Sequence, residues 1–437
     1  MFTCYMAYHN LNWAIVELAA YTRQMSFRLF PLLLLTVALV AFGIVFPHDA
    51  GGTDFNLADN IKLSPEVILR EVYSDNIYLV DDETTDDYVT SVLPDMGMQI
   101  AFTPRSRVEL LYLGRFDFYK NMDNFRQDHH YGHMNLQFDT PKGSSVNLGA
   151  WGEDSANQPD STEDRSKDYR VHALYADVDL MVFSATELFG TYHRSSRRFD
   201  DTIDRDDDYD RDFFALGLVN SQSSLFPLLL EYRYETQEND QPATGSTDFV
   251  YQAAYTGFKW REDQRLSGSL RVGYLWSAYN SASAYDGWVT DTDLTYALSA
   301  FTRITGTAYR GVRESTRSAR ETLDYYIYTG GRLSVAYSRL DPFRIRMYGR
   351  YENRDYRLTE ASVDSREDDL YSAGVSAQYN LRDWLSISLG YVYRMNDSSL
   401  EIQNYKENRV FAELIFLSNG NVRRKRLPRS IDQIDFF

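Results

Sequence analysis

The sequence predicts an all-β fold: a transmembrane antiparallel up-and-down β-barrel of about 18 strands, with short periplasmic turns and long extracellular loops. Three observations predict it. Segments that alternate apolar and polar residues run from about residue 65 to residue 417. Short turns and longer acidic loops alternate between these segments. The composition combines 15% aromatic residues with a negative mean hydropathy of −0.45, which suits a polar lumen inside an aromatic-rich wall.

The short turns recur at a spacing of roughly 40 residues, which equals two strands, one turn and one loop. A soluble sandwich does not usually keep its short connections on one side and its long ones on the other. A barrel that crosses a membrane does, because its two ends face different compartments. The turns are expected at 103–106, 140–145, 181–186, 220–225, 260–265, 299–302, 338–342 and 380–384.

The segment from Leu266 to Ala278 shows the strand pattern best. Its two faces read Leu266, Gly268, Leu270, Val272, Tyr274, Trp276 and Ser267, Ser269, Arg271, Gly273, Leu275, Ser277. About 11 residues of such alternation are enough for a tilted strand to cross a bilayer core. Residues 108–118, 343–352 and 410–416 repeat the pattern. In lipid every backbone polar group must be paired, so such strands have to close into a ring.

Taken in order, the strands are expected near 65–79, 87–102, 107–119, 129–140, 146–153, 168–180, 186–195, 211–219, 225–235, 248–258, 266–278, 288–298, 302–312, 323–337, 343–353, 369–379, 385–395 and 409–417. Pro227 falls inside one of them, close to its turn end, where proline is tolerated.

The chain is expected to divide into four parts. Residues 1–50 form a targeting region, with a signal peptide over residues 25–50, because an apolar run from Leu29 to Phe46 follows basic residues. The run is also long enough for a membrane helix, an alternative that the exported character of the rest disfavours. Residues 51–64 form a periplasmic lead, 65–417 the outer-membrane barrel, and 418–437 a basic periplasmic tail.

Charge and cysteine content exclude several classes of protein. The net charge of −18 argues against nucleic-acid binding. The single cysteine, Cys4, lies before the barrel, so the barrel has neither a disulfide framework nor thiol chemistry. Four tryptophans lie at predicted strand ends, where an aromatic girdle would meet the membrane interfaces: Trp260 and Trp384 at short turns, Trp276 and Trp288 beside a long loop.

Two stretches carry a family resemblance. Residues 73–79 (YSDNIYL), 86–89 (DDYV) and 93–97 (LPDMG) resemble the start of the β-barrel porin type 2 family, and residues 405–412 (YKENRVFA) resemble its closing strand. Members of this family are outer-membrane barrels often encoded with genes for exopolysaccharide synthesis and secretion. The resemblance therefore implies an outer-membrane location and a transport role, with no catalytic motif and no cofactor.

A set of arginines is predicted to face the lumen and to form a path for an anionic polymer. Same-face residues of a strand lie roughly 6.6 Å apart, so such arginines could pass a chain from one to the next. The alternative is that these charges only pair across strands and solvate the interior. The candidates are Arg344, Arg346, Arg350, Arg332, Arg394, Arg271 and Arg233.

Three other chemistries are disfavoured. His129 and His133 share a strand face but lie roughly 13 Å apart, too far for one metal ion. The acidic run from Asp204 to Asp212 lacks the glycine and terminal glutamate of an EF-hand loop. His172 and His193, the latter close to Ser195 and Ser196, come without a nucleophile elbow, so no enzyme and no metal site is expected.

The sequence and the resemblance together predict an outer-membrane channel of a Gram-negative bacterium that exports exopolysaccharide. A general or solute-specific diffusion porin is the alternative, and a plugged structural or adhesive barrel is the third class. The expected partners are outer-membrane lipids and lipopolysaccharide, the barrel-assembly machinery and a periplasmic polysaccharide-export protein.

Overall fold

We describe a computed structural model of the chain. The chain divides into two units, Met1–Gly52 and Thr53–Phe437. The structure describes residues 55–122, 125, 128–157, 167–201, 208–223, 225–240, 248–261, 265–279, 284–314, 323–338, 342–358 and 366–416. The predicted signal peptide, Cys4 and the predicted basic tail lie outside these residues. No helix in the described part is long and apolar enough to cross a membrane.

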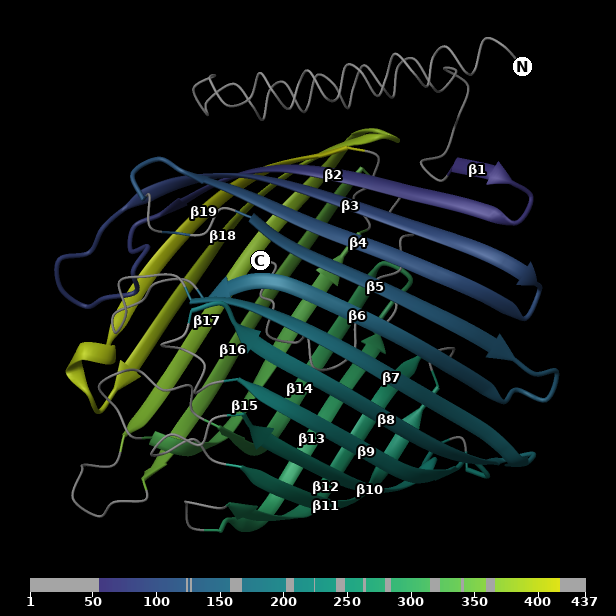
Figure 1. The fold of residues 1–437 in the computed structure, drawn as a ribbon. Helices are drawn as coiled ribbons and strands as arrows, with labels where there is room; N and C mark the ends of the chain where they lie inside the picture. Colours follow the sequence, from purple (N-terminus) through teal and green to yellow (C-terminus); the bar gives the residue numbers. More distant parts are fainter. Residues whose placement is uncertain are drawn as a thin grey trace. The chain divides into compact units, whose positions relative to one another are not determined.

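The second unit is a closed antiparallel barrel (Figure 1). Each strand from β2 to β19 pairs with the next in sequence, and β19 pairs back with β2, so eighteen strands form the ring. The strand count and the up-and-down order confirm the predicted fold class. Short turns join the strands at one end, here the turn end, and longer connections join them at the other, the loop end.

The strands are β2 (Ile61–Ser74), β3 (Asp87–Thr103), β4 (Ser106–Tyr119), β5 (Asp128–Asp139), β6 (Ser145–Asn157), β7 (Lys167–Phe183), β8 (Thr186–Phe199), β9 (Tyr209–Asn220), β10 (Leu228–Asn239), β11 (Phe249–Trp260), β12 (Leu266–Tyr279), β13 (Asp286–Ala297), β14 (Thr302–Glu314), β15 (Leu323–Tyr337), β16 (Phe343–Leu358), β17 (Glu367–Arg382), β18 (Leu385–Ser398) and β19 (Tyr405–Phe416). A 3₁₀ turn, η2 (Glu401–Gln403), precedes β19.

The barrel begins earlier than the sequence pattern suggested. β2 starts at Ile61, inside the stretch expected to be a periplasmic lead, and a short strand β1 (Phe55–Ala58) pairs with its beginning. Pro65, which lacks a backbone N–H group, lies within β2, and the predicted strand did not extend before it. Pro227, which was expected inside a strand, lies one residue before β10.

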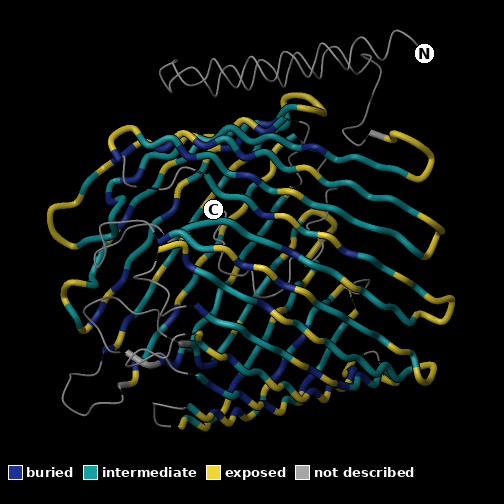
Figure 2. The backbone as a smooth tube through the Cα atoms, viewed as in Figure 1, coloured by how far each residue is buried: buried dark blue, intermediate teal, exposed yellow. Residues whose placement is uncertain are grey.

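Side chains alternate between the lumen and the outer surface along every strand, and Figure 2 shows the alternation of exposed and less exposed positions. On β12 the exposed apolar residues are Val272, Tyr274 and Trp276, which belong to the face predicted to be apolar. Arg271 and Leu275, on the other face, are buried inside the barrel. Because lipid-facing residues of a barrel are apolar and appear exposed in an isolated chain, this pattern identifies the outer surface.

Buried polar contacts close the ring where the first and last strands meet. Glu407 on β19 is fully buried and accepts hydrogen bonds from Ser74 Oγ on β2, at 2.6 Å, and from Arg394 Nε on β18, at 2.6 Å. Arg70 Nε donates to Glu413 across the same strands at 2.7 Å. The contacts of Ser74 with Glu407 and of Arg70 with Glu413 join residues more than 300 positions apart in the chain and fix the register of closure.

One part of the wall departs from the regular ring. β13 pairs with β14 only from Thr290 and Arg310 to the turn end, whereas β14 and β15 stay paired for several residues beyond. In that extension Val312, Tyr325 and Ile327 occupy the face that points outward lower down, yet all three are buried. They pack with the lumen-facing side chains of Phe249, Tyr251, Ala253, Leu275 and Val289 from β11, β12 and β13. The described residues at the loop end of this hairpin, Val312, Tyr325 and Ile327, therefore lie on the lumen side of the wall formed by β11–β13.

Candidate functional site: the charged lumen

Three of the predicted arginines lie in one transverse row of the wall. Arg332 on β15 pairs with Arg350 on β16, which pairs with Ser372 on β17. Ser372 pairs in turn with Arg394 on β18. Residues paired across strands point to the same face, so all three arginines point into the lumen.

The row is stabilised by local partners. Arg350 donates to Glu352 Oε2 at 2.8 Å and to the Tyr309 hydroxyl at 3.2 Å. The guanidinium of Arg332 lies 4.4 Å from the ring centroid of Tyr348, a cation–π contact. These contacts offset part of the repulsion between Arg332 and Arg350, which lie directly opposite each other.

Towards the turn end the same wall carries arginines that are exposed in the lumen. Arg303 on β14 and Arg346 on β16 both pair with Ala336 on β15, so they share one row. Arg344 lies two residues before Arg346 on the same face. All three side chains are exposed. We call these residues and the two adjoining arginines the arginine stripe: Arg303, Arg332, Arg344, Arg346 and Arg350.

Two of the predicted polymer-path arginines are instead engaged in a buried ion-pair cluster. Arg271 is 5% exposed and donates to Glu231 Oε2 at 2.8 Å. Arg233 donates to Glu231 Oε1 at 2.6 Å and to Asp291 Oδ2 at 2.9 Å, and its guanidinium lies 4.5 Å from the Tyr255 ring centroid. Charge neutralisation and burial leave these groups little capacity to attract a solute, so their role is to join β10, β12 and β13.

Carboxylates line the opposite wall at the same end. In a ring of eighteen strands, β5–β8 lie across from β14–β17 (Figure 1). Asp177 and Asp179 on β7 accept hydrogen bonds from the hydroxyls of Thr191, at 2.8 Å, and Ser145, at 3.0 Å. Asp139 on β5 accepts from the side-chain amide of Gln137 at 2.9 Å. Asp139 also lies 3.9 Å from Arg107 Nη1 on β4, so part of this negative charge is neutralised. At the turn end the lumen thus has exposed arginines on β14 and β16 and carboxylates on β5 and β7.

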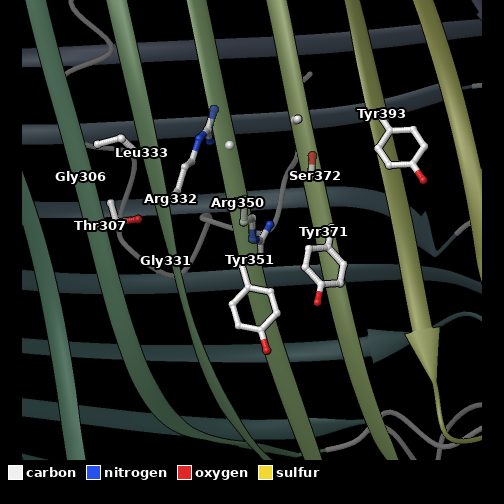
Figure 3. A pocket seen from close by; sticks show the side chains of 12 residues that line it. Gly306, Thr307, Gly331, Arg332, Leu333, Arg350, Tyr351, Tyr371, Ser372 and Tyr393 are labelled. Atoms are coloured by element: carbon white, nitrogen blue, oxygen red, sulfur yellow. The ribbon is translucent and has the colours of Figure 1, made fainter.

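A hollow lies over the arginine row, and Figure 3 shows Arg332 and Arg350 on neighbouring strands there. Most of its lining belongs to the outer face, where Gly306, Gly331 and Gly349 leave the strands uncovered. The exposed rings of Tyr351 and Tyr371 border it. The hollow is thus a thin part of the wall on its membrane side and is distinct from the channel.

The four tryptophans predicted to form a girdle lie at the strand ends. Trp276 and Trp288 are 47% and 53% exposed on outward positions of β12 and β13 at the loop end. Trp384 is exposed in the turn before β18, and Trp260 ends β11 and donates from Nε1 to the Leu225 carbonyl at 3.0 Å. Their contact with the membrane interface stays a prediction.

The histidines of β5 each have a hydroxyl group close by. Within the described ranges, no group of three or more metal-ligating side chains is close enough to hold an ion. His129 Nδ1 contacts Ser155 Oγ at 2.8 Å, and His133 Nε2 contacts the Tyr175 hydroxyl at 2.8 Å. Each imidazole thus has a hydroxyl partner on the lumen wall. The acidic run from Asp204 to Asp207 lies outside the described residues.

Comparison with known proteins agrees with this architecture. Residues 62–416 match the family described as "Putative beta-barrel porin 2", so the chain belongs to that family. No curated protein matches. The chain is therefore an outer-membrane β-barrel of the porin type and not an enzyme.

Several solved structures are similar to this chain at low sequence identity. OccAB3 of Acinetobacter baumannii is 12% identical with a TM-score of 0.42 (81% of this chain, 99% of that one). OccK2 (OpdF) of Pseudomonas aeruginosa, solved with glucuronate, is 10% identical with a TM-score of 0.45 (81% and 98%). OpdO of Pseudomonas aeruginosa is 10% identical with a TM-score of 0.44 (83% and 98%).

Proposed function

We propose that this protein is a diffusion porin that passes small solutes through the outer membrane, and that anionic solutes cross it along the arginine stripe. The observation that carries the proposal is the exposure of Arg303, Arg344 and Arg346 on one wall of the lumen. Fixed charges that line a wide pore raise the local concentration of the opposite ion without binding it tightly, which permits both entry and release.

Export of an anionic polysaccharide, the function that the sequence first suggested, has weaker support. Four of the seven arginines expected to line a polymer path are held in ion pairs: Arg233, Arg271, Arg350 and Arg394. Such pairing favours a structural role over successive capture of a charged chain. A conduit also requires a periplasmic export protein as partner, and deletion of the gene would then reduce the polysaccharide at the cell surface. We expect that deletion to leave it unchanged.

Uptake into proteoliposomes tests the proposal. We expect the reconstituted protein to admit gluconate faster than glucose, which has a similar size and no charge. Removing three exposed arginines together (Arg303→Gln, Arg344→Gln and Arg346→Gln) removes on the order of 1 kcal/mol of attraction and lowers gluconate uptake about fivefold. Glucose uptake should change little.

A matched variant of the opposite wall serves as the control. Asp139→Asn combined with Asp179→Asn should raise gluconate uptake or leave it unchanged, because it removes negative charge from the lumen. Equal gluconate and glucose uptake in all three proteins would overturn the anion path. A barrel that admits neither solute would overturn the porin proposal and point to the plugged class.

A further inference from the structure

We propose that the loop-end part of the β14–β15 hairpin is the size-limiting section of the pore, and that Arg313 and Tyr328 are its specificity-determining residues. This inference rests on the proposed diffusion function and names the element that selects solutes by size. The residues of this part are those of β14 up to Arg313 and of β15 from Tyr325.

Two contacts of β14 show the position of the hairpin. Arg310 still faces outward, since its guanidinium lies 4.7 Å from the ring centroid of Trp288, which is exposed on the outer surface. Two residues further along β14, Val312 is 9% exposed and packs with Val289, a lumen-facing residue of β13. The strand therefore passes from beside β13 to the lumen side of β13 within these two residues.

One ring contact between β12 and β15 could not form in a regular barrel wall. The rings of Tyr279 on β12 and Tyr325 on β15 stack with centroids 4.8 Å apart and planes 5° from parallel. Strands three apart in a flat wall are separated by roughly 14 Å. The stacking shows that the ends of β12 and β15 meet because the hairpin lies over the inner face of β12 and β13.

The hairpin has one face against the wall and one face towards the pore. Its outer face is buried against the wall, so its other face points towards the pore. That face carries Arg313, whose guanidinium lies 5.1 Å from the Tyr328 ring centroid, and Tyr326, whose ring centroid lies 5.0 Å from that of Tyr356. Arg354 lies 5.3 Å from the Tyr326 ring centroid. Tyr326 and Tyr356 are themselves buried, at 7% and 5% exposed, so the half-buried Arg313 and Tyr328 are the groups of this face that solutes can reach.

The hairpin narrows the pore. Two β layers packed face to face lie about 10 Å apart, so the second layer narrows the lumen by about that distance on one side. Gly311 leaves room for the Tyr328 side chain across the hairpin, because a Cβ atom at Gly311 would lie 2.6 Å from the Tyr328 hydroxyl. The apolar cluster of Val312, Tyr325 and Ile327 with the wall holds the second layer in place.

A cross-linking experiment on the full chain tests the position of the hairpin. Tyr279→Cys and Tyr325→Cys are introduced together in a Cys4→Ser background, and the folded protein is treated with dibromobimane, which joins thiols about 5 Å apart. We expect efficient cross-linking. The control pair is Thr307→Cys with Ser372→Cys, which lie three strands apart in one row of the regular wall. Cross-linking of neither pair, or of both equally, overturns the proposed position.

A size-exclusion experiment tests the role of the hairpin. Proteoliposome swelling is measured with neutral sugars from a monosaccharide to a tetrasaccharide. Val312→Asp releases the hairpin from its apolar cluster, so we expect tetrasaccharide entry to rise at least about threefold as the second layer, about 10 Å thick, moves aside. Val171→Asp, in the apolar cluster of β5–β7 on the opposite wall, is the matched control and should not widen the pore.

The outcomes separate this inference from the proposed function. If the wild-type protein admits small solutes but Val312→Asp has the same size limit, the hairpin is not the size-limiting section and the porin function stands. If Val312→Asp does not fold, the cross-linked Tyr279→Cys/Tyr325→Cys protein decides: it must keep wild-type conductance and size limit, because the proposal places the hairpin there in the conducting state. A change in either overturns the inference.

Discussion

Arg332 on β15 and Arg350 on β16 are direct cross-strand partners, with both side chains in the lumen. Like charges placed opposite each other on a sheet destabilise it. Glu352 and Tyr348 offset the repulsion from the neighbouring positions. The pair places two guanidinium groups side by side on the lumen wall, and Arg350 is in turn ion-paired with Glu352.

Replacing one member of this pair should not destabilise the barrel. We expect Arg332→Gln to leave the free energy of unfolding unchanged or to raise it by up to about 1 kcal/mol, because the like-charge contact is lost. Urea unfolding in lipid vesicles, followed by tryptophan fluorescence, measures this. Arg70→Gln is the control, since it leaves Glu413 without its 2.7 Å partner and should cost a few kcal/mol, about 3. A loss of stability in Arg332→Gln as large as in the control would contradict the expectation.

The closing seam should depend on Glu407. Glu407→Gln leaves the guanidinium groups of Arg394 and Arg409 without the buried carboxylate that they share. We expect the free energy of unfolding to fall by about 3 kcal/mol. Glu401→Gln, an exposed position in η2, should have no effect on the same urea transition. An equal response of the two variants would show that the buried network does not stabilise closure.

The alternation of faces on β15 can be tested with a single charge. Leu333 is 59% exposed on the outer surface, whereas Ser334 faces the lumen beside Tyr348. Leu333→Arg should lower the free energy of unfolding in a bilayer by about 2–4 kcal/mol, because it places a guanidinium in lipid. Ser334→Arg should be tolerated. The reverse order in a vesicle-folding assay would mean that the register is shifted by one residue.

The outward tryptophans should contact lipid at the interface. In variants that keep only Trp276 or only Trp288, we expect fluorescence to be quenched by lipids brominated near the head group more than by lipids brominated near the chain end. Trp151, which is 7% exposed within the apolar cluster of β5–β7, should be protected from both. Equal quenching of Trp151 and Trp276 would contradict the assignment of the outer surface.

Much of this fold could be predicted from the sequence because a barrel strand repeats a simple pattern. The alternation along 266–278 gave the outward face of β12 correctly, and the turn spacing gave the strand count. The alternation along 343–352 also placed Arg344, Arg346 and Arg350 on one strand face, and the register pairs Arg350 with Arg332 on that face.

Two features could not be predicted because they depend on contacts between strands. Which lumen charges neutralise each other is set by register, so the buried pairing of Arg271 with Glu231, two strands away, has no local signal. The inward position of the β14–β15 hairpin is similar. Val312 and Ile327 have the spacing of lipid-facing residues, and a period-2 pattern identifies the face of a strand but not where the strand leaves the wall.

The reversal potential of single channels in a planar bilayer, under a gradient of potassium chloride, tests the central claim most directly. We expect open channels whose reversal potential has the sign that indicates a preference for chloride over potassium. We also expect this preference for chloride to weaken when Arg303, Arg344 and Arg346 are replaced by glutamine. A cation-selective channel, or a selectivity that does not respond to those replacements, would contradict the claim that the arginine stripe is the path of the permeating solute.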